Sequence, residues 1–383
     1  MYVPLYASTK STGAAQSTMT VNAHRYCSYY LILLLFSNIT IILSSAFSAT
    51  RPSAESPSAK TIMSDQASQE ERRTPITRRR YYSPFLSPLH GSNTNSAALI
   101  ILNTPIKSTA NSSLPDVFRV LWKSTSFHVC ADGGANRLYD ATIGPSSSGD
   151  DIDDNDALIP DLITGDLDSI RSDVRSYYEK KGVPIVCVED QNYHDLDKSL
   201  MAVEKWIEKL TTTSSSSSSS LSNEDSDSNG FNQSSQAFIY GGFGGRFDQE
   251  MACINTLYSW GQKEAFQQTQ MSIFDEETGV ILLPEAPISN EILIRFPDIE
   301  EDDDNESREK SDQVEVGEGP TCGLIPIGAR CERVYTSGLK WNLDGDMPLE
   351  FGGLVSSSNR IVDKVVTVKT SSPLLFSFEI VKR

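Results

Sequence analysis

The sequence has little of what several common catalytic and binding sites require. Its 383 residues include only 4 histidines, so a histidine-based zinc site or Ser-His-Asp catalysis has little material. The 6 cysteines contain no CxxC pair, which indicates reduced thiols in a reducing compartment rather than a disulfide framework. Lys and Arg number 33 against 51 Asp and Glu, and this formal net charge of −18 disfavours a nucleic-acid-binding surface.

A long hydrophobic run is missing as well. The most apolar stretch, residues 29–43, contains polar residues and is shorter than the roughly 20 residues of a transmembrane helix. Basic residues before it and small residues after it give it the layout of a signal peptide, and the Arg-rich segment that follows is transit-like. The alternative is a fortuitous leader, with translation starting at Met63. We therefore exclude residues 1–96 from the fold as a disordered N-terminal extension. We expect no membrane span in the folded part and favour the cytoplasm over organellar targeting.

From residue 97 the pattern changes to short apolar runs that alternate with amphipathic segments. Runs such as Ala98–Leu102 and Phe127–Ala131 are almost wholly apolar, which is typical of strands buried on both faces of a parallel sheet. This alternation predicts a three-layer α/β domain with a mostly parallel sheet over residues 97–285. A serine-rich segment at residues 211–236 cannot bury a core, so we expect a disordered insertion there.

Beyond residue 271 short strand-like runs follow one another, and no further amphipathic helix is evident. Asp344-Gly345 is a hairpin signal between Leu339–Leu343 and Leu349–Phe351. We predict a C-terminal antiparallel β-sandwich over residues 286–383, with an acidic insertion at residues 298–318.

The segment Pro160–Ser169 suggests a cation site. An apolar run ends there on Gly165, followed by Asp166 and Asp168. Side chains two residues apart on an extended backbone point the same way, so both carboxylates can face one cation. Oxygen ligands favour magnesium over zinc. The alternative is a solvated surface turn rich in Asp and Gly.

Acids also follow other predicted parallel strands. They are Asp132, Asp190 with Asp195, and Asp248. The carboxyl ends of parallel strands share one edge of a sheet, and carboxylates gathered there repel one another unless a cation is bound. This arrangement favours the metal site over the solvated turn, although Asp195 and Asp248 also suit the first turns of the helices that follow them. Lys198 and Arg246 supply positive charge that a triphosphate would need.

Six segments resemble eukaryotic thiamin pyrophosphokinases in their order and spacing. They are Ala131–Tyr139, Gly165–Ile170, Asp190–Asp195, Gly244–Gln249, Cys322–Gly328 and Gly338–Leu343. The resemblance extends from about Ala98 to the C-terminus without the two insertions, and it leaves the N-terminal extension unexplained.

The resemblance implies a transferase of the kinase type, a thiamine diphosphokinase. It would move pyrophosphate from ATP to the hydroxyl of thiamin and give thiamin diphosphate and AMP, with Mg²⁺ as cofactor and ATP as co-substrate. It also implies an α/β domain with a β-sandwich, paired as a homodimer with the active site at the subunit interface. The alternatives are a non-catalytic thiamin- or nucleotide-binding protein of the same fold, and a different Mg²⁺-dependent nucleotide hydrolase.

The resemblance also assigns roles to residues. It places magnesium on Asp166, Asp168 and Asp195, and it makes these three and Asp248 catalytic. Nucleotide contacts fall to Asp132, Gly133, Asn136, Arg137, Gln191, Lys198 and Arg246. The thiamin side falls to Trp341, Ser356, Ser358 and Asn359. Asp248 and Asp166 are candidates, by position only, for accepting the hydroxyl proton. The chain carries Asn192-Tyr193-His194 where animal members have Asp-His-Thr, so nucleotide contacts are expected to differ there.

Overall fold

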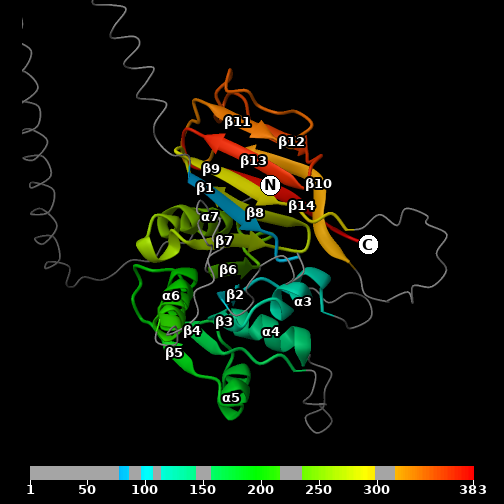
Figure 1. Ribbon diagram of the computed structural model, residues 1–383. Helices are drawn as coiled ribbons and strands as arrows, with labels where there is room; N and C mark the ends of the chain where they lie inside the picture. The colour runs from blue at the N-terminus through cyan, green and yellow to red at the C-terminus, as the bar shows by residue number, and fades with distance from the viewer. Residues whose placement is uncertain (1–76, 86–95, 107–113, 144–156, 216–234, 298–314) are drawn as a thin grey trace, which may run out of the picture. The chain divides into compact units, whose positions relative to one another are not determined.

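The computed structural model describes residues 77–85, 96–106, 114–143, 157–215, 235–297 and 315–383 (Figure 1). The signal-like stretch at residues 29–43, most of the serine tract and most of the acidic insertion lie outside these ranges. None of the helices within them combines the length and the apolar character that crossing a membrane requires.

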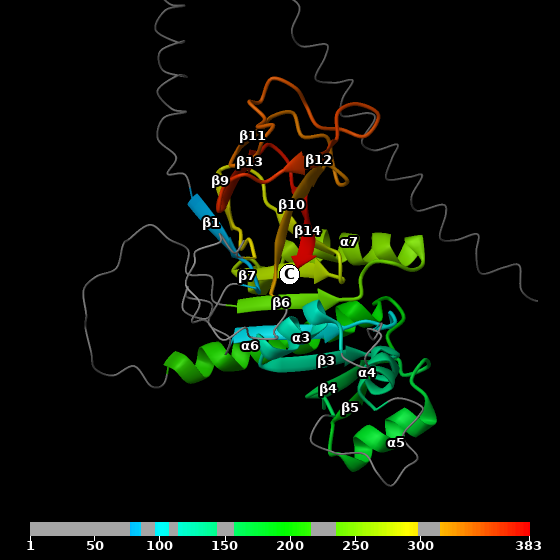
Figure 2. The same ribbon diagram turned by 90° about the vertical axis from the view of Figure 1, so that its right-hand side faces the viewer.

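Most of the described strands join one ten-stranded sheet, in the order β12-β10-β14-β8-β7-β6-β2-β3-β4-β5. Its parallel half consists of β7 (Thr269–Phe274), β6 (Ser235–Tyr240), β2 (Ala97–Ile101), β3 (Phe127–Ala131), β4 (Leu162–Gly165) and β5 (Ile185–Cys187). Figure 2 shows β7, β6, β3, β4 and β5 one below the other. The predicted mostly parallel sheet is confirmed.

Alternate residues of the buried strands pack against two different sets of helices. Leu99 and Ile101 of β2 share a core with α3 (Asp116–Lys123), α4 (Gly134–Thr142) and α5 (Ser172–Lys180). Ala98 and Ile100 share a second core with α6 (Asp195–Ser215) and α7 (Phe247–Gly261), which leads into the short 3₁₀ helix Glu264–Phe266. All of β2 is 0% exposed, as an uninterrupted apolar run predicts. The three-layer arrangement is therefore confirmed.

The other half of the large sheet is antiparallel. It consists of β8 (Thr278–Leu283), β14 (Leu374–Lys382), β10 (Val316–Ile325) and β12 (Ser356–Arg360). A four-stranded sheet follows the order β1-β9-β13-β11, with β1 (Thr77–Tyr82), β9 (Ile288–Leu293), β13 (Val365–Thr370) and β11 (Val334–Ser337). Val366 and Val368 of β13 share a core with Phe376 and Phe378 of β14, so the two sheets form a sandwich. The predicted antiparallel region is confirmed. One of its two sheets, however, is continuous with the parallel strands of the α/β region. The predicted domain boundary between residues 285 and 286 therefore stays a prediction.

Part of the segment that the sequence analysis excludes from the fold is ordered, so that exclusion is wrong at its C-terminal end. Residues 77–82 form β1, which pairs in parallel with β9. Tyr81 is 2% exposed and its hydroxyl donates to the Leu282 carbonyl at 3.1 Å, while Arg80 pairs with Glu291 at 3.0 Å. Three consecutive arginines give this strand a transit-like composition, which conceals its alternation of an inward Tyr and an outward Arg.

Other expectations are corrected at their boundaries. α6 continues to Ser215 and β6 begins at Ser235, so the serine-rich insertion is shorter than residues 211–236. β10 begins at Val316, inside the expected acidic insertion. The predicted strand over residues 339–343 is wrong, because Leu339 makes only an isolated bridge to Ile361. β11 and β12 were not predicted, and β12 is too rich in serine to show an apolar alternation.

Glu276, in the turn between β7 and β8, links three elements that are distant in sequence. Its carboxylate accepts the backbone N–H of Phe118 at 3.1 Å, at the start of α3, where Pro115 supplies no side-chain cap. It also accepts the hydroxyl of Tyr240 at 3.0 Å and the ammonium of Lys382 at 2.5 Å. One carboxylate therefore ties the last strand of the sandwich to the α/β layers.

Glu318 is a buried carboxyl in β10 and is 2% exposed. It accepts the backbone N–H of Arg295 at 2.7 Å. Burial raises the pKa of Glu318 to about 7, although hydrogen bonds from Ser83 and Arg295 oppose the shift. The folded protein therefore favours the protonated form of Glu318 more than the unfolded chain does.

We predict that β1 is required for stability. Removing residues 1–96 takes away two buried aromatic side chains, Tyr81 and Phe85, and exposes the edge of β9. Losing buried aromatics costs about 3–5 kcal/mol each, so the melting temperature should fall by many degrees. Calorimetry should show full stability in a chain that begins at Glu70, and equal stability of the two truncated proteins would contradict the prediction.

We also predict a pH-dependent loss of stability at Glu318. Because its folded pKa lies above its unfolded value, its contribution is complete below about pH 4.5 and is lost as the pH rises to about 7. The loss should be on the order of 3 kcal/mol. Denaturant unfolding at pH 5 and pH 7.5 should show a smaller decline in Glu318→Gln than in wild type, while Glu315→Gln, at a half-exposed position, should decline as wild type does. Parallel declines in all three proteins would refute this role for Glu318.

Candidate active site

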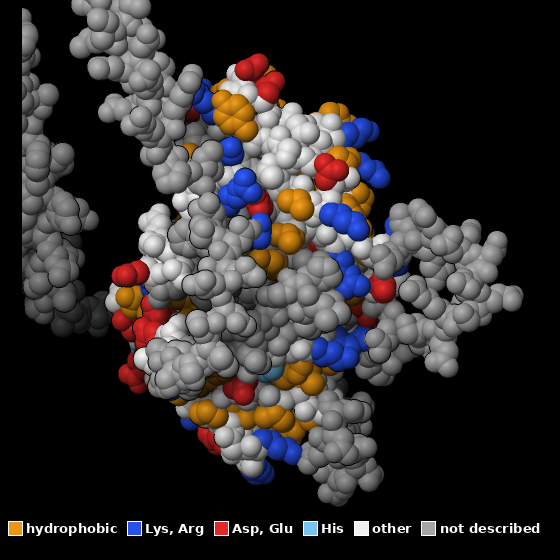
Figure 3. Space-filling model, in the orientation of Figure 1, with side chains coloured by type: hydrophobic (Ala, Val, Ile, Leu, Met, Phe, Trp, Pro, Cys, Tyr) orange, Lys and Arg blue, Asp and Glu red, His pale blue; other side chains and the backbone are white. Residues whose placement is uncertain are grey.

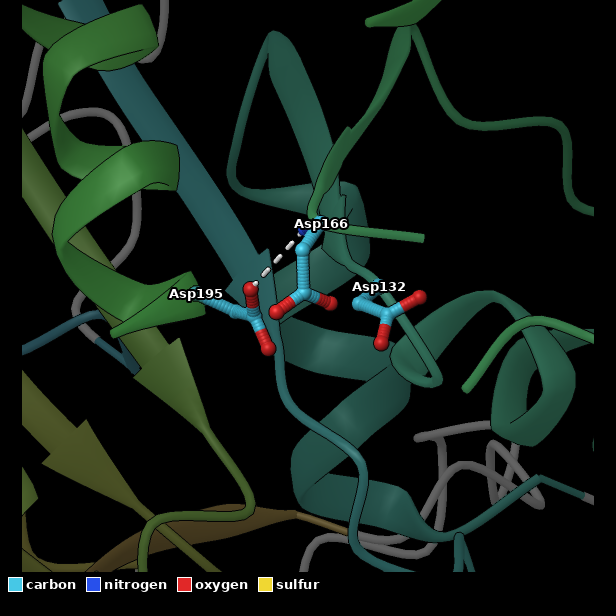
Figure 4. A group of neighbouring side chains, drawn as sticks. All are labelled: Asp132, Asp166 and Asp195. Atoms are coloured by element: carbon cyan, nitrogen blue, oxygen red, sulfur yellow. Dashed lines mark hydrogen bonds between the residues drawn. The ribbon is translucent and has the colours of Figure 1, made fainter. Parts of the chain in front are cut away.

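Three carboxylates converge at the carboxyl edge of the parallel strands. Asp132 follows β3, Asp166 follows β4, and Asp195 is the first residue of α6, the helix after β5. One oxygen of each lies within 4.8 Å of the others. Figure 4 shows Asp195 and Asp166 with their carboxylates next to each other and Asp132 on the other side of Asp166. We call this group the carboxylate cluster.

Asp132 is the buried member of the carboxylate cluster. It is 2% exposed and has a positive φ of 42°. Its carboxylate accepts the backbone N–H groups of Ser169 at 3.0 Å and Ile170 at 3.1 Å. Burial raises the pKa of Asp132, and the nearby carboxylates of Asp195 and Asp166 add to the rise. Asp132 therefore fixes the turn that carries Asp166.

Asp166 and Asp195 are joined to each other and to Lys198. The Asp166 backbone N–H donates to Asp195 Oδ1 at 3.3 Å, the contact dashed in Figure 4. Lys198 Nζ lies 3.2 Å from Asp195 Oδ1 and 3.7 Å from Asp166 Oδ2. Burial alone would raise the pKa of Asp166, but hydrogen bonds from the Asp168 backbone and Gln191, together with Lys198, hold it below its ordinary value. Asp166 is therefore ionised at neutral pH.

Gly165 makes this convergence sterically feasible. A Cβ atom at this position would lie 2.7 Å from Asp132 Cβ and 3.0 Å from Asp195 Oδ1. A side chain would thus occupy the space between two members of the carboxylate cluster. The glycine in the sequence motif serves close approach rather than only a turn.

The structure does not bring two of the predicted acids into the cluster. Asp168 is exposed, and its carboxylate accepts the Ser169 hydroxyl at 2.8 Å. Asp248 is exposed at the start of α7 and forms an ion pair with Arg246, whose side chain is 73% exposed. The pKa of Asp248 is lowered, first by its hydrogen bond with Arg246. Gln191 donates a hydrogen bond to Asp166 Oδ2 at 3.4 Å.

The predicted nucleotide-binding residues at the start of α4 mainly hold the neighbouring loops in place. Gly133 packs on Asn103, with no room for a side chain between them. Asn136 is 7% exposed; it donates to the Ser169 carbonyl at 2.8 Å and accepts the Arg171 N–H at 3.0 Å. Arg137 donates to Asn103 Oδ1 at 2.8 Å. These contacts hold the loop after β4 against α4.

Glu250 is a residue that the sequence analysis missed. Its carboxylate accepts the backbone N–H groups of Gly244 at 2.9 Å and Gly245 at 3.1 Å. These are the donors that a glycine-rich phosphate loop would offer to an anion. A Glu in the first turn of the helix that follows the glycines is the signal that indicates such a contact.

The predicted thiamin residues form a second group, on β12 and on the loop after β11. Trp341 is 56% exposed, whereas Asn359 is 4% exposed. The Asn359 side chain accepts the Trp341 N–H at 3.3 Å, donates to the Trp341 carbonyl at 2.9 Å and donates to Ser356 Oγ at 3.3 Å. Ser358 has a φ of 58° and lines a cavity of about 460 Å³ over β10 and β14. Asn359 thus holds the backbone that presents Trp341.

The carboxylate cluster suits a hard divalent cation. It offers oxygen ligands alone, from three side chains that the fold has already brought together. Carboxylate oxygen is the preferred protein ligand of Mg²⁺. Asp132, Asp166 and Asp195 fit magnesium by this chemistry. Asp168, which the sequence analysis also named as a ligand, lies outside this group, and its role stays a prediction.

Comparisons with known proteins agree with this geometry. A family model described as "Thiamin pyrophosphokinase, catalytic domain" matches residues 118–271, and one described as "Thiamin pyrophosphokinase, vitamin B1 binding domain" matches residues 308–375. Thiamine pyrophosphokinase 1 of Arabidopsis thaliana is 32% identical over 302 residues, covering 78% of this chain and 92% of that protein. Thiamine pyrophosphokinase of Saccharomyces cerevisiae is 28% identical over 321 residues, covering 76% and 88%. The solved structure of thiamin pyrophosphokinase from Candida albicans has a TM-score of 0.54 at 26% identity, covering 80% of this chain and 95% of its own.

We predict that Gly165→Ala abolishes the response of the protein to divalent cations. The added methyl would displace Asp132 or Asp195, so the rise in melting temperature that Mn²⁺ together with a non-hydrolysable ATP analogue gives the wild type should be lost. Gly261→Ala is the matched control, because a Cβ there meets only ordinary contacts at 3.8 and 3.9 Å. A wild-type Mn²⁺ response in Gly165→Ala would show that the cluster is not the cation site.

Proposed function

The chain belongs to the thiamin pyrophosphokinase family, and from this premise we propose that it transfers pyrophosphate from ATP to the hydroxyl of thiamin in a Mg²⁺-dependent reaction. The observation that carries the proposal is the carboxylate cluster at the strand edge, within the segment that matches the family's catalytic domain. The comparisons favour this catalytic role over a non-catalytic binding protein of the same fold.

The reaction is mainly one of positioning and charge. The thiamin hydroxyl oxygen forms a bond to the β-phosphorus of ATP while the bond from that phosphorus to the α,β-bridging oxygen breaks. AMP leaves, and the hydroxyl proton passes to a base or to water. Bound Mg²⁺ would neutralise charge on the phosphate oxygens, so the protein needs little covalent chemistry of its own.

The charge and exposure of the residues at the carboxyl edge of the parallel strands suggest a separate role for each. Asp132, Asp166 and Asp195 would hold the cation. Arg246 is largely exposed and would exchange its ion pair with Asp248 for contacts to the triphosphate. Because the pKa values of Asp166 and Asp248 are both lowered, these carboxylates suit cation and guanidinium binding better than proton abstraction. Asp168, two residues after Asp166, remains a proposed ligand that would approach only with the metal–nucleotide complex.

We propose further that the protein works as a homodimer with thiamin bound between subunits. Exposed apolar side chains occur on the segments that follow β11 and β12, with Trp341 56%, Met347 62%, Phe351 64% and Val362 52% exposed. Figure 3 shows hydrophobic side chains among charged ones on one face of the protein. Among the described residues, no hydrogen bond or ion pair joins Trp341 to the carboxylate cluster, and in the proposed dimer a second copy would bring the thiamin side to the cluster. The exposed indole face suits a cationic heteroaromatic ring such as the thiazolium of thiamin.

The test is an assay of the full chain with ATP, Mg²⁺ and thiamin. Wild type should form AMP and thiamin diphosphate in equal amounts, and Asp166→Asn should lower turnover about 100-fold or more with an unchanged melting temperature, because a metal ligand is lost without any core contact. Asp173→Asn, an exposed acid on α5, is the control and should keep full activity. AMP without thiamin diphosphate would instead indicate a nucleotide hydrolase, and no product from folded wild type would overturn the proposal.

A further inference from the structure

We propose that Lys198 is a built-in counter-ion of the carboxylate cluster, which offsets part of the cluster's negative charge before the metal arrives and keeps its affinity for free divalent cations low. The consequence is that the cation enters with the nucleotide rather than residing in the protein beforehand. This inference rests on the proposed function, and it replaces the role in phosphate binding that the sequence analysis gave to Lys198.

The side chain of Lys198 is too deeply buried to meet a phosphate that arrives from solvent. Its side chain is 1% exposed, whereas that of Arg246 at the same edge is 73% exposed. A triphosphate arriving from solvent can meet Arg246 directly, but it can meet Lys198 only after the cluster opens. The ammonium faces Asp195 and Asp166, at 3.2 and 3.7 Å, and not the open side.

The position of Lys198 in its helix supports the same role. It lies in the first turn of α6, where the helix dipole is positive and disfavours a cation. A lysine that is buried there needs compensation by negative charge. Asp195, three residues earlier, and Asp166 from β4 provide that compensation. The cluster and the lysine therefore stabilise each other in the absence of a metal.

The remaining hydrogen bonds show how fully the cluster is supported without a cation. Asp132 is held by two backbone N–H groups, and Asp166 accepts from Gln191 at 3.4 Å and from the Asp168 N–H at 3.3 Å. Removing the ammonium would leave these contacts in place, so the carboxylates would keep their positions. What changes is the charge, because three carboxylates would then face the cation with no positive neighbour.

A divalent cation bound to these oxygens lies beside the Lys198 ammonium and is repelled by it. This repulsion is poorly screened, because the ammonium is shielded from water. The triphosphate of ATP brings additional negative charge and oxygen ligands, which offset the repulsion. Binding of metal and nucleotide should therefore be strongly coupled in the wild type and weakly coupled without the lysine.

The experiment is a titration of the full chain with Mn²⁺, followed by electron paramagnetic resonance, with and without a non-hydrolysable ATP analogue. In wild type the analogue should tighten Mn²⁺ binding at least tenfold. In Lys198→Met, Mn²⁺ alone should bind at least tenfold more tightly than to wild type, and the effect of the analogue should shrink. Lys205→Met, an exposed lysine on the same helix, is the matched control and should behave as wild type.

Lys198→Gln provides a second variant, since its amide can still donate to Asp195 without carrying charge. It should tighten Mn²⁺ binding as Lys198→Met does. A variant that folds only when Mn²⁺ is present would also support the proposal, because the metal then replaces the ammonium. Mn²⁺ affinity equal to or weaker than that of wild type would overturn it, as would failure of both variants to fold even with Mn²⁺, which would assign Lys198 to packing. If wild type bound no Mn²⁺ even with the ATP analogue, the proposed function itself would fail.

Discussion

Mutual repulsion between carboxylates is the constraint on which the site depends. The parallel strands bring Asp132, Asp166 and Asp195 to within 4.8 Å of one another, in a partly buried position where like charges are costly. The surroundings compensate with backbone N–H donors, a glycine that keeps the space between the acids open, and one buried ammonium. The residues around the cluster, including Asn136 and the loop after β4, are arranged to maintain that compensation.

The parts of the structure that follow from local pattern were predictable from the sequence. Continuous apolar runs identified β2 and β3, and the Gly-Asp turn identified the edge that carries the site. Two assignments within the site depend on distances that sequence spacing does not encode. Asp168 shares the alternation of Asp166, yet the turn after Gly165 leaves it exposed, and the buried Asp132 completes the cluster instead. The contact of Lys198 with Asp166 appears only when α6 is packed against β4.

Long-range pairing explains the other differences. Each residue of β1 pairs with a residue of β9 that lies 211 positions later in the chain, as Arg78 does with Ser289, and the arginines of β1 conceal its buried face. β12 has few apolar residues, because its place at the edge of the sheet depends on backbone pairing with β10 and on the Asn359 amide. Such strands are specified by their partners more than by their own composition. Glu276 shows the same principle, since it caps a helix that lies more than 150 residues earlier in the chain.

The pairing of β1 with β9 limits how much of the N-terminal part of the chain could be removed without loss of structure. Whatever precedes residue 77 can be cleaved without loss of a described strand, but a protease that cuts after that point would remove a strand from the sandwich. Sheet pairing therefore limits any N-terminal processing, independently of a targeting signal. Accurate processing would be a condition for folding as well as for delivery.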